Sequence, residues 1–266
     1  MGKENFMGLE NPGIAVITGA SSGFGNLFAK RLSDQGFDLI ITARRKDRLE
    51  ALAKELSEKN STNVEVIVGD LAKMEDINNL AARVKNIDNL DCLINNAGVG
   101  TGEDFLNPNA NLDEYLNMIN LHCKAPMVVT HAALASMMKR DRGLVMNIST
   151  IASLVLHGSH EPIYNSTKSF LSVFTEMIQL KLNAAKSKVK MKAICPGFTI
   201  TEMTQYADKS DTKRYSAWDT AEDVVDHALG NYHNKDIIII SGKHFTEEVK
   251  NWRKVARTKP GRYFYF

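Results

Sequence analysis

Short apolar runs of strand length alternate along the chain with longer segments whose apolar residues recur every three to four positions. The first pattern predicts buried β-strands and the second predicts α-helices. Strands are predicted at residues 14–17, 38–42, 64–68, 91–94, 144–148, 190–195 and 237–240; one helix ends before Gly36, and others are predicted at 47–59, 74–86, 112–139, 164–182 and 221–229. Strands separated by helices of about ten to fifteen residues favour right-handed βαβ crossovers, so we predict an α/β protein with a parallel sheet.

A glycine-rich turn, Thr18-Gly19-Ala20-Ser21-Ser22-Gly23-Phe24-Gly25, lies between the first strand and the first helix. The order of strand, glycine turn and helix is what a phosphate-binding loop needs. We expect Gly19 to permit the tight turn, Gly23 to let the backbone approach a diphosphate, and Gly25 to let the helix pack on the strand. Ordinary turns also collect glycine and serine, so the position after the first strand is what favours a dinucleotide site.

Ala43, Arg44 and Arg45 follow the second predicted strand. NAD-binding units carry an acidic residue there, which binds the ribose 2′-hydroxyl, whereas an arginine fits a 2′-phosphate. The sequence therefore predicts NADP rather than NAD. The alternative is that Arg44 and Arg45 only begin a solvated helix, although cations near a helix N-terminus oppose its dipole.

Polar residues also follow the third, fourth and fifth predicted strands, where parallel sheets place their functional groups. They are Asp70, the turn Asn95-Asn96-Ala97-Gly98 and the pair Ser149-Thr150. Asn120 lies in an apolar part of the segment 112–139 and needs hydrogen-bond partners. It either bonds a neighbouring segment for structure or holds a water for chemistry.

Tyr164 and Lys168 are four positions apart, so a helix would bring them to one face with Cβ atoms within about 6 Å. A neighbouring cation favours the phenolate, which makes Tyr164 a candidate for proton transfer. The alternative is an amphipathic helix with Tyr and Lys on its surface, which an isolated pair of this kind usually is.

Composition excludes several classes of function. The 266 residues include 33 basic and 31 acidic ones, and this net charge of +2 gives no reason to expect nucleic acid or an anionic membrane as a partner. The three cysteines have no disulfide or zinc spacing, and His157 and His160 lack a third ligand, so no metal is expected. No apolar run approaches the roughly 18 residues of a membrane span, so we expect a soluble cytoplasmic protein.

The C-terminal part of the chain contains two less regular segments. Residues 199–218 are polar and lack periodicity, which is typical of a lid over a site. Residues 243–266 form an extension in which we expect a basic helix at 244–257 and an aromatic tail. No linker divides the chain, so 1–266 is taken as one domain.

With these motifs identified, the chain resembles the short-chain dehydrogenase/reductase family over roughly residues 13–242. The matching motifs are Thr18-Gly19-(x)3-Gly23-x-Gly25, Asn95-Asn96-Ala97-Gly98, Asn120, Tyr164-(x)3-Lys168 and Pro196-Gly197-(x)3-Thr201. Residues 43–49 look like the NADP-dependent members of broad substrate range. The resemblance implies a single-domain Rossmann fold, a doubly wound parallel sheet of about seven strands flanked by helices, and assembly into a homodimer or homotetramer.

The resemblance also implies roles for individual residues. Tyr164 would exchange a proton with a carbonyl or alcohol, while Lys168 would hold the nicotinamide ribose and lower the tyrosine pKa. Asn120 would keep a water that links Lys168 to solvent. The residues implied to contact NADP(H) are Gly19, Ser21, Ser22, Gly23, Phe24, Gly25, Arg44, Arg45, Asp70, Leu71, Asn96, Ala97, Gly98, Tyr164, Lys168, Pro196, Gly197, Thr199 and Thr201.

One departure from the family concerns the serine that orients the substrate. It usually stands thirteen positions before the tyrosine, and Ile151 occupies that position here. Aligned from the preceding strand, Thr150 takes its place and is favoured over Ser149, since a threonine hydroxyl donates the same hydrogen bond. Phe24, where the family has a smaller aliphatic residue, is a lesser departure.

These observations predict an NADP(H)-dependent oxidoreductase that interconverts a carbonyl and a secondary alcohol on a small or medium apolar substrate. Thr150 would polarise the oxygen, Tyr164 would move the proton, and Lys168 with Asn120 would maintain the relay. The missing serine motivates an alternative, an NADPH-binding sensor with weak or no catalysis. Residues 157–163 and 206–218 would select the substrate, and their sequence does not identify it.

Overall fold

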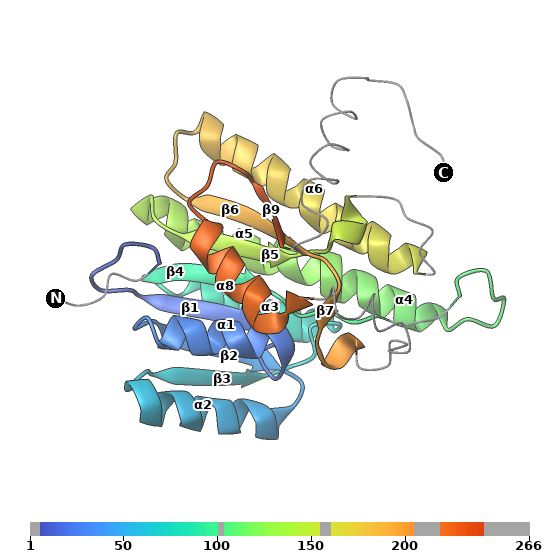
Figure 1. Ribbon diagram of the computed structural model, residues 1–266, viewed down its shortest axis with the longest axis horizontal. Helices are drawn as coiled ribbons and strands as arrows, with labels where there is room; N and C mark the ends of the chain where they lie inside the picture. Colours follow the sequence, from blue (N-terminus) through green and yellow to red (C-terminus); the bar gives the residue numbers. More distant parts are fainter. Residues whose placement is uncertain (1–5, 101–103, 155–160, 205–218, 242–266) are drawn as a thin grey trace.

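The computed structural model describes residues 6–100, 104–154, 161–204 and 219–241. Its centre is a sheet of seven parallel strands in the order β3-β2-β1-β4-β5-β6-β9 (Figure 1). The strands are β1 Ile14–Thr18, β2 Asp38–Ala43, β3 Val64–Val68, β4 Leu90–Asn95, β5 Leu144–Ile148, β6 Lys190–Pro196 and β9 Ile238–Ser241. The order reverses between β1 and β4, and ligands of such sheets bind in the crevice at this point. The predicted single-domain Rossmann fold is confirmed.

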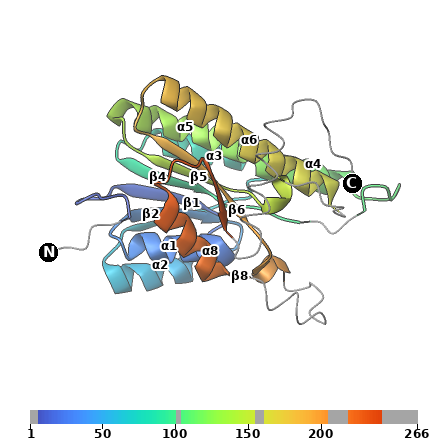
Figure 2. The ribbon, with the colours of Figure 1, turned by 45° about the horizontal axis from the view of Figure 1, so that its top comes forward.

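Helices cover both faces of the sheet (Figure 2). One face carries α1 Gly23–Ser33, α2 Lys46–Asn60 and α8 Ala221–Asn231; the other carries α3 Met74–Lys85, α4 Leu112–Ile119, α5 Ala125–Arg140 and α6 Pro162–Ala184. Each face has its own apolar core. Ile17 of β1 packs with the α1 and α8 side, whereas its neighbour Val16 packs with the α3 and α5 side, as the alternation of a strand requires.

The segment predicted as one helix at 112–139 is interrupted. A π-helical turn, η1 Asn120–Lys124, separates α4 from α5, and the backbone N–H of Ala125 donates to the carbonyl of Asn120, five residues earlier. Pro126 explains the interruption. A proline has no N–H to donate to the carbonyl of His122, and its ring would collide with that carbonyl in a regular α-helix. The prediction of a continuous helix was therefore wrong at the turn that contains Asn120.

A second sheet, absent from the sequence-based prediction, joins two short segments near the carboxyl end of β6. Strand β7 Thr199–Ile200 pairs in parallel with β8 Asp219–Thr220, and between them lies a 3₁₀ turn, η3 Glu202–Thr204. Thr220 caps α8: its side chain accepts from the N–H of Asp223, whose carboxylate accepts in return from Thr220.

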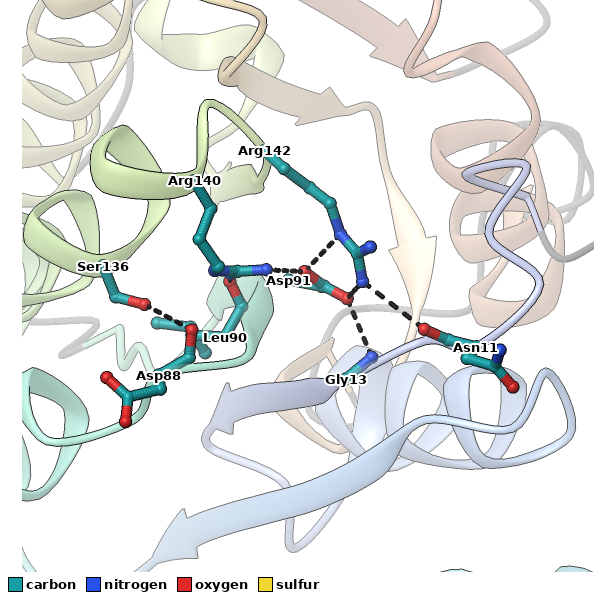
Figure 3. Close-up of polar contacts among 8 residues, drawn as sticks. All are labelled: Asn11, Gly13, Asp88, Leu90, Asp91, Ser136, Arg140 and Arg142. Carbon is teal, nitrogen blue, oxygen red and sulfur yellow. Dashed lines mark hydrogen bonds and ion pairs between the residues drawn. The ribbon is translucent and has the colours of Figure 1, made fainter.

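Asp91, near the start of β4, anchors the amino-terminal end of the sheet, opposite the end at which the parallel strands finish. Figure 3 shows its contacts. This fully buried carboxylate accepts from the N–H of Gly13 at 2.8 Å and from the guanidinium groups of Arg140 and Arg142. Burial alone would raise the pKa of Asp91, but these hydrogen bonds outweigh it and hold the pKa below the ordinary value. The cluster thus ties the start of β1 to β4 and to the end of α5.

Some expectations fall outside the described residues: residues 205–218 of the lid predicted at 199–218, His157 and His160, and the extension from 243 onward with its helix at 244–257. Within the described ranges, no helix is both long and apolar enough to cross a bilayer. The same ranges contain no grouping of three or more His, Cys, Asp and Glu side chains that could bind a metal ion.

Candidate active site

The glycine turn after β1 is shaped by close backbone contacts. Gly19 has a φ of +68°, and a Cβ there would lie 2.8 Å from the Cα of Ala97. A Cβ on Gly25 would lie 2.3 Å from the carbonyl oxygen of Gly19. Gly25 was expected to let the helix pack on the strand, but it packs the start of the helix on the turn itself. Gly23 has a φ of +54° and open space above it. The turn therefore leaves a cradle of backbone at the N-terminus of α1, which fits a diphosphate.

The turn after β4 is fastened to the glycine turn. The side-chain amide of Asn96 donates to the carbonyl oxygens of Thr18 and Gly19, at 2.9 and 3.2 Å. In return, the Thr18 hydroxyl oxygen accepts from the backbone N–H groups of Asn96 and Ala97. The two turns at the β1/β4 crevice thus form one rigid unit, in which Asn96 has a structural role beside any contact with a ligand.

Arg45 reaches across the glycine turn. Its guanidinium donates to the hydroxyl groups of Ser21 and Ser22, and its Nη1 lies 2.9 Å from a carboxylate oxygen of Glu202. Arg48 binds the other oxygen of the same carboxylate. Hydrogen bonds from Arg48 and then Arg45 lower the pKa of Glu202 to about 2. Glu202, which sequence reasoning did not select, is thus held as an anion beside the turn.

Arg44 differs from Arg45 in its surroundings. Its side chain is exposed and has no ion pair or side-chain hydrogen bond with another described residue. Arg45 begins α2 while bonded to the glycine turn, so the solvated-helix interpretation does not describe Arg45.

The residues after β3 make contacts within the protein. Asp70 accepts from the N–H of Ala72 at 3.1 Å, and the side chain of Leu71 is buried in the core. The side-chain amide of Asn120 donates to the carbonyl of Ala72 at 2.9 Å. Of the two roles considered for Asn120, the structural one is thus observed: its amide holds the loop after β3 against the π-helical turn.

Tyr164 and Lys168 lie on the first turns of α6, with the ammonium nitrogen 5.7 Å from the centre of the phenol ring. Lys168 is buried, and its ammonium donates to the carbonyl of Ile148 at the end of β5, at 2.9 Å. Burial lowers the pKa of Lys168 to about 8. A Cβ on Gly98 would lie 3.3 Å from the same ammonium, which places the turn after β4 directly against the pair.

The expected lowering of the Tyr164 pKa by Lys168 is not found in this structure. Burial raises the pKa of the Tyr164 phenol above its ordinary value, and the Glu161 carboxylate raises it further. The ammonium of Lys168 is directed to a backbone carbonyl, so its charge does not offset the loss of water around the phenol. Tyr164 is therefore protonated at neutral pH.

His122 joins three segments of the site and was missed by sequence reasoning. The N–H of Val99 donates to its Nε2 at 3.0 Å, so Nε2 carries no proton and Nδ1–H faces the hydroxyl of Thr167 at 2.9 Å. The Thr167 hydroxyl donates in turn to the carbonyl of Tyr164 at 2.8 Å. Burial, followed by the charge of Lys168, holds the pKa of His122 well below its ordinary value, so the imidazole is neutral.

The two hydroxyl residues after β5 have different environments. Ser149 is buried, and its hydroxyl bonds the carbonyl of Lys168 at 2.9 Å and the hydroxyl of Ser172 at 2.8 Å. Thr150 is partly exposed. Among the described residues, its hydroxyl oxygen accepts one hydrogen bond, a longer one of 3.3 Å from the N–H of Ala152. Ser149 is thus committed to the protein, while the Thr150 hydroxyl retains a proton to donate.

The segment after β6 closes the site on the side of Glu202. The N–H of Gly197 donates to the carbonyl of Ser241 at 2.8 Å, and the buried hydroxyl of Thr199 donates to the carbonyl of Gly197. Thr204 braces the following turn, since its hydroxyl oxygen accepts from the N–H of Thr201 at 2.9 Å. These bonds fix the backbone that carries Glu202.

Comparison with known protein families identifies the family of this chain. The family model described as short chain dehydrogenase matches residues 13–212, which is more than half of the chain. The chain belongs to the short-chain dehydrogenase family. Membership makes it an oxidoreductase by class, in agreement with the resemblance inferred from the motifs.

Individual relatives support this membership. A protein of Staphylococcus aureus (strain MRSA252) described as an uncharacterized oxidoreductase is 30% identical over 213 residues, which are 80% of this chain and 89% of that protein. A short-chain dehydrogenase from Sphingobium yanoikuyae, solved in complex with NADPH, has a TM-score of 0.81 and 25% identity and covers 96% of this chain and 98% of its own.

A bulky-bulky ketone specific alcohol dehydrogenase from Comamonas testosteroni has the same fold. Its TM-score is 0.80 at 24% identity, and the match covers 94% of this chain and 96% of that one. The short-chain dehydrogenase fold thus extends over almost the whole molecule.

Proposed function

We propose that this short-chain dehydrogenase is an NADP(H)-dependent enzyme that interconverts a carbonyl and a secondary alcohol on a small or medium apolar substrate. The observation that carries the proposal is the pair formed by Tyr164 and Lys168. It lies at the start of α6, against Gly98, whose turn is fastened to the glycine cradle through Asn96. A protonated phenol, a buried ammonium and a dinucleotide cradle at one sheet edge match carbonyl reduction.

The cofactor choice is supported by charge. Arg44 and Arg45 follow β2, where an NAD-binding unit would carry a carboxylate, and Arg45 reaches the glycine turn through Ser21 and Ser22. The Sphingobium relative, 25% identical, is described in complex with NADPH. The residues expected to hold NADP(H) here include the glycine turn, the turn after β4 and the segment from Pro196 to Thr201.

The chemistry of this chain's own residues follows from their protonation states. The cofactor supplies the hydride in reduction. Tyr164, kept protonated by burial, donates its phenolic proton to the carbonyl oxygen of the substrate. Thr150 donates a hydrogen bond to the same oxygen, and the charge of Lys168 stabilises the phenolate that remains.

The rival proposal is a sensor that binds NADPH without efficient turnover, which the absence of the family's serine favours. A panel of ketones and aldehydes, with NADPH oxidation as the readout, separates the two. Turnover of any panel member that is lost in Tyr164→Phe supports the enzyme. Tight NADPH binding without turnover across the whole panel supports the sensor.

We also propose a homodimer or homotetramer. The outer side of α6 exposes a row of large apolar side chains, Phe170, Val173, Met177 and Leu180, and α4 exposes Leu112 and Leu116. Apolar side chains at helical spacing on one face are typical of a covered surface. Pairing of α6 and α4 with a second copy would bury them.

A further inference from the structure

The carboxylate of Glu202 has a position that sequence reasoning did not anticipate. One of its oxygens binds Arg45 at 2.9 Å and the other binds Arg48, so the anion bridges two guanidinium groups. The three side chains come from two distant parts of the chain, the start of α2 and the turn η3 after β6. A carboxylate shared in this way satisfies donors that a phosphate group would equally satisfy.

Arg45 connects Glu202 to the proposed cofactor site. Its Nε and Nη2 donate to the hydroxyl groups of Ser21 and Ser22, so the guanidinium is fixed above the glycine turn. If that turn holds a dinucleotide, its 2′-phosphate would bind the same arginine side chains after the end of β2. Because a guanidinium presents a planar fork of donors, Glu202 and a phosphate compete for the same edge of Arg45.

We propose that Glu202 is a specificity-determining residue: its carboxylate competes with the 2′-phosphate of NADP(H) for Arg45 and Arg48, and so weakens the binding of NADP(H) but not of NAD(H). This inference rests on the proposed cofactor site. The Glu202 carboxylate, at the start of η3, would thus be an internal counter-ion. NADP(H) would displace it, and a cofactor without the phosphate would leave it in place.

The size of the effect follows from exposure. The side chains of Arg45, Arg48 and Glu202 are each nearly half exposed, so water and salt screen the ion pairs. Two exposed pairs of this kind correspond to a change in affinity of roughly threefold to tenfold.

The test measures the dissociation constants of NADPH and NADH by fluorescence titration for the wild-type protein and for Glu202→Gln. Glutamine keeps the shape of the side chain and removes its charge. The matched control is Glu50→Gln, which removes the same charge from α2. Among the described residues, Glu50 forms an ion pair only with Lys46, at 3.6 Å. We expect Glu202→Gln to bind NADPH roughly threefold to tenfold more tightly, with NADH and the control variant changed by less than about twofold.

A second background shows whether Arg45 mediates the effect. In Arg45→Gln, the gain in NADPH affinity from Glu202→Gln should shrink, because the competition for that guanidinium no longer exists. Weaker NADPH binding by Glu202→Gln, or an equal gain for NADPH and NADH, would overturn the inference while leaving the cofactor proposal intact. A wild-type protein that binds NADH more tightly than NADPH would instead overturn the proposed cofactor itself, and the inference with it.

Discussion

The imidazole of His122 and the hydroxyl of Thr167 share a hydrogen bond of 2.9 Å, which links the π-helical turn to the helix that carries Tyr164. The bond is one of three in series, since Val99 donates to the same imidazole and Thr167 donates to the carbonyl of Tyr164. The backbone of the turn after β4 is thereby coupled to the backbone at the proposed proton donor. Misplacement of a reacting group by about 1 Å is enough to slow catalysis strongly.

Thr167→Val should therefore lower kcat for carbonyl reduction by roughly tenfold while changing NADPH affinity little, because the series is broken next to Tyr164 and not at the cradle. Valine keeps the shape of threonine but leaves the Nδ1–H of His122 without an acceptor. Thr167→Ser keeps the hydroxyl and serves as the control, with near wild-type kcat. Equal losses in both variants would show that the methyl group matters, not the hydrogen bonds.

The pH dependence of reduction should follow Lys168. Burial lowers the pKa of Lys168 to about 8, so its charge is present below that pH and lost above it. We expect kcat/KM to fall as pH rises through about 8, because the neutral amine no longer stabilises the Tyr164 phenolate. Residual activity of Lys168→Arg should lack this decline, since a guanidinium stays charged. A decline that begins only near the ordinary lysine pKa of about 10.4 would contradict the account.

Asp91 should be required for stability and not for chemistry, since it lies at the opposite edge of the sheet. Asp91→Asn removes the counter-charge of Arg140 and Arg142, whose side chains are 26% and 39% exposed, so the free energy of unfolding at neutral pH should fall by about 1–3 kcal/mol. The pKa of Asp91 is lowered by folding, so its contribution is complete above the ordinary Asp pKa of about 3.9 and is lost as the pH falls through the folded-state value.

Urea unfolding at neutral pH measures this contribution. Asp88→Asn is the matched control, because Asp88 is exposed and its carboxylate points away from the two arginines (Figure 3). Equal stability of the two variants would mean that the buried cluster contributes nothing beyond an ordinary surface carboxylate.

The apolar row on α6 should control assembly. Replacing Val173 and Met177, whose surfaces are 56% and 54% exposed, by aspartate places charges in the proposed contact and should yield monomers in sedimentation velocity at micromolar concentration. Val68→Asp, on β3 at the edge of the sheet, introduces a comparable change elsewhere and should leave assembly unaffected. A wild-type protein that sediments only as a monomer would contradict the proposed oligomer.

The sequence was sufficient to predict the sheet and the glycine turn after its first strand, because apolar runs and glycine turns are local signals. Residues 64–68 and 144–148 were predicted with the bounds that β3 and β5 show. The π-helical turn was not predicted, although Pro126 was its visible cause. Helical periodicity alone does not distinguish a regular helix from one with a single inserted residue.

The contacts that sequence reasoning missed depend on packing between distant residues. Glu202 lies 157 positions from Arg45, and no spacing rule joins them. His122 is an unremarkable residue in an apolar segment until Val99 and Thr167 flank it. The raised pKa of Tyr164 arises from burial, which the motif does not encode, whereas the motif does encode the nearby charge of Lys168.

The most direct test of the central claim compares Tyr164→Phe with the wild-type protein in steady-state NADPH oxidation, using a ketone that the wild type reduces. Tyr232→Phe is the control, since this tyrosine packs on Phe6 and Lys190, away from the site. We expect kcat to fall by about 10²–10⁴-fold in Tyr164→Phe, with NADPH affinity retained and Tyr232→Phe unaffected. Wild-type turnover in Tyr164→Phe would contradict the assignment of Tyr164 as the proton donor.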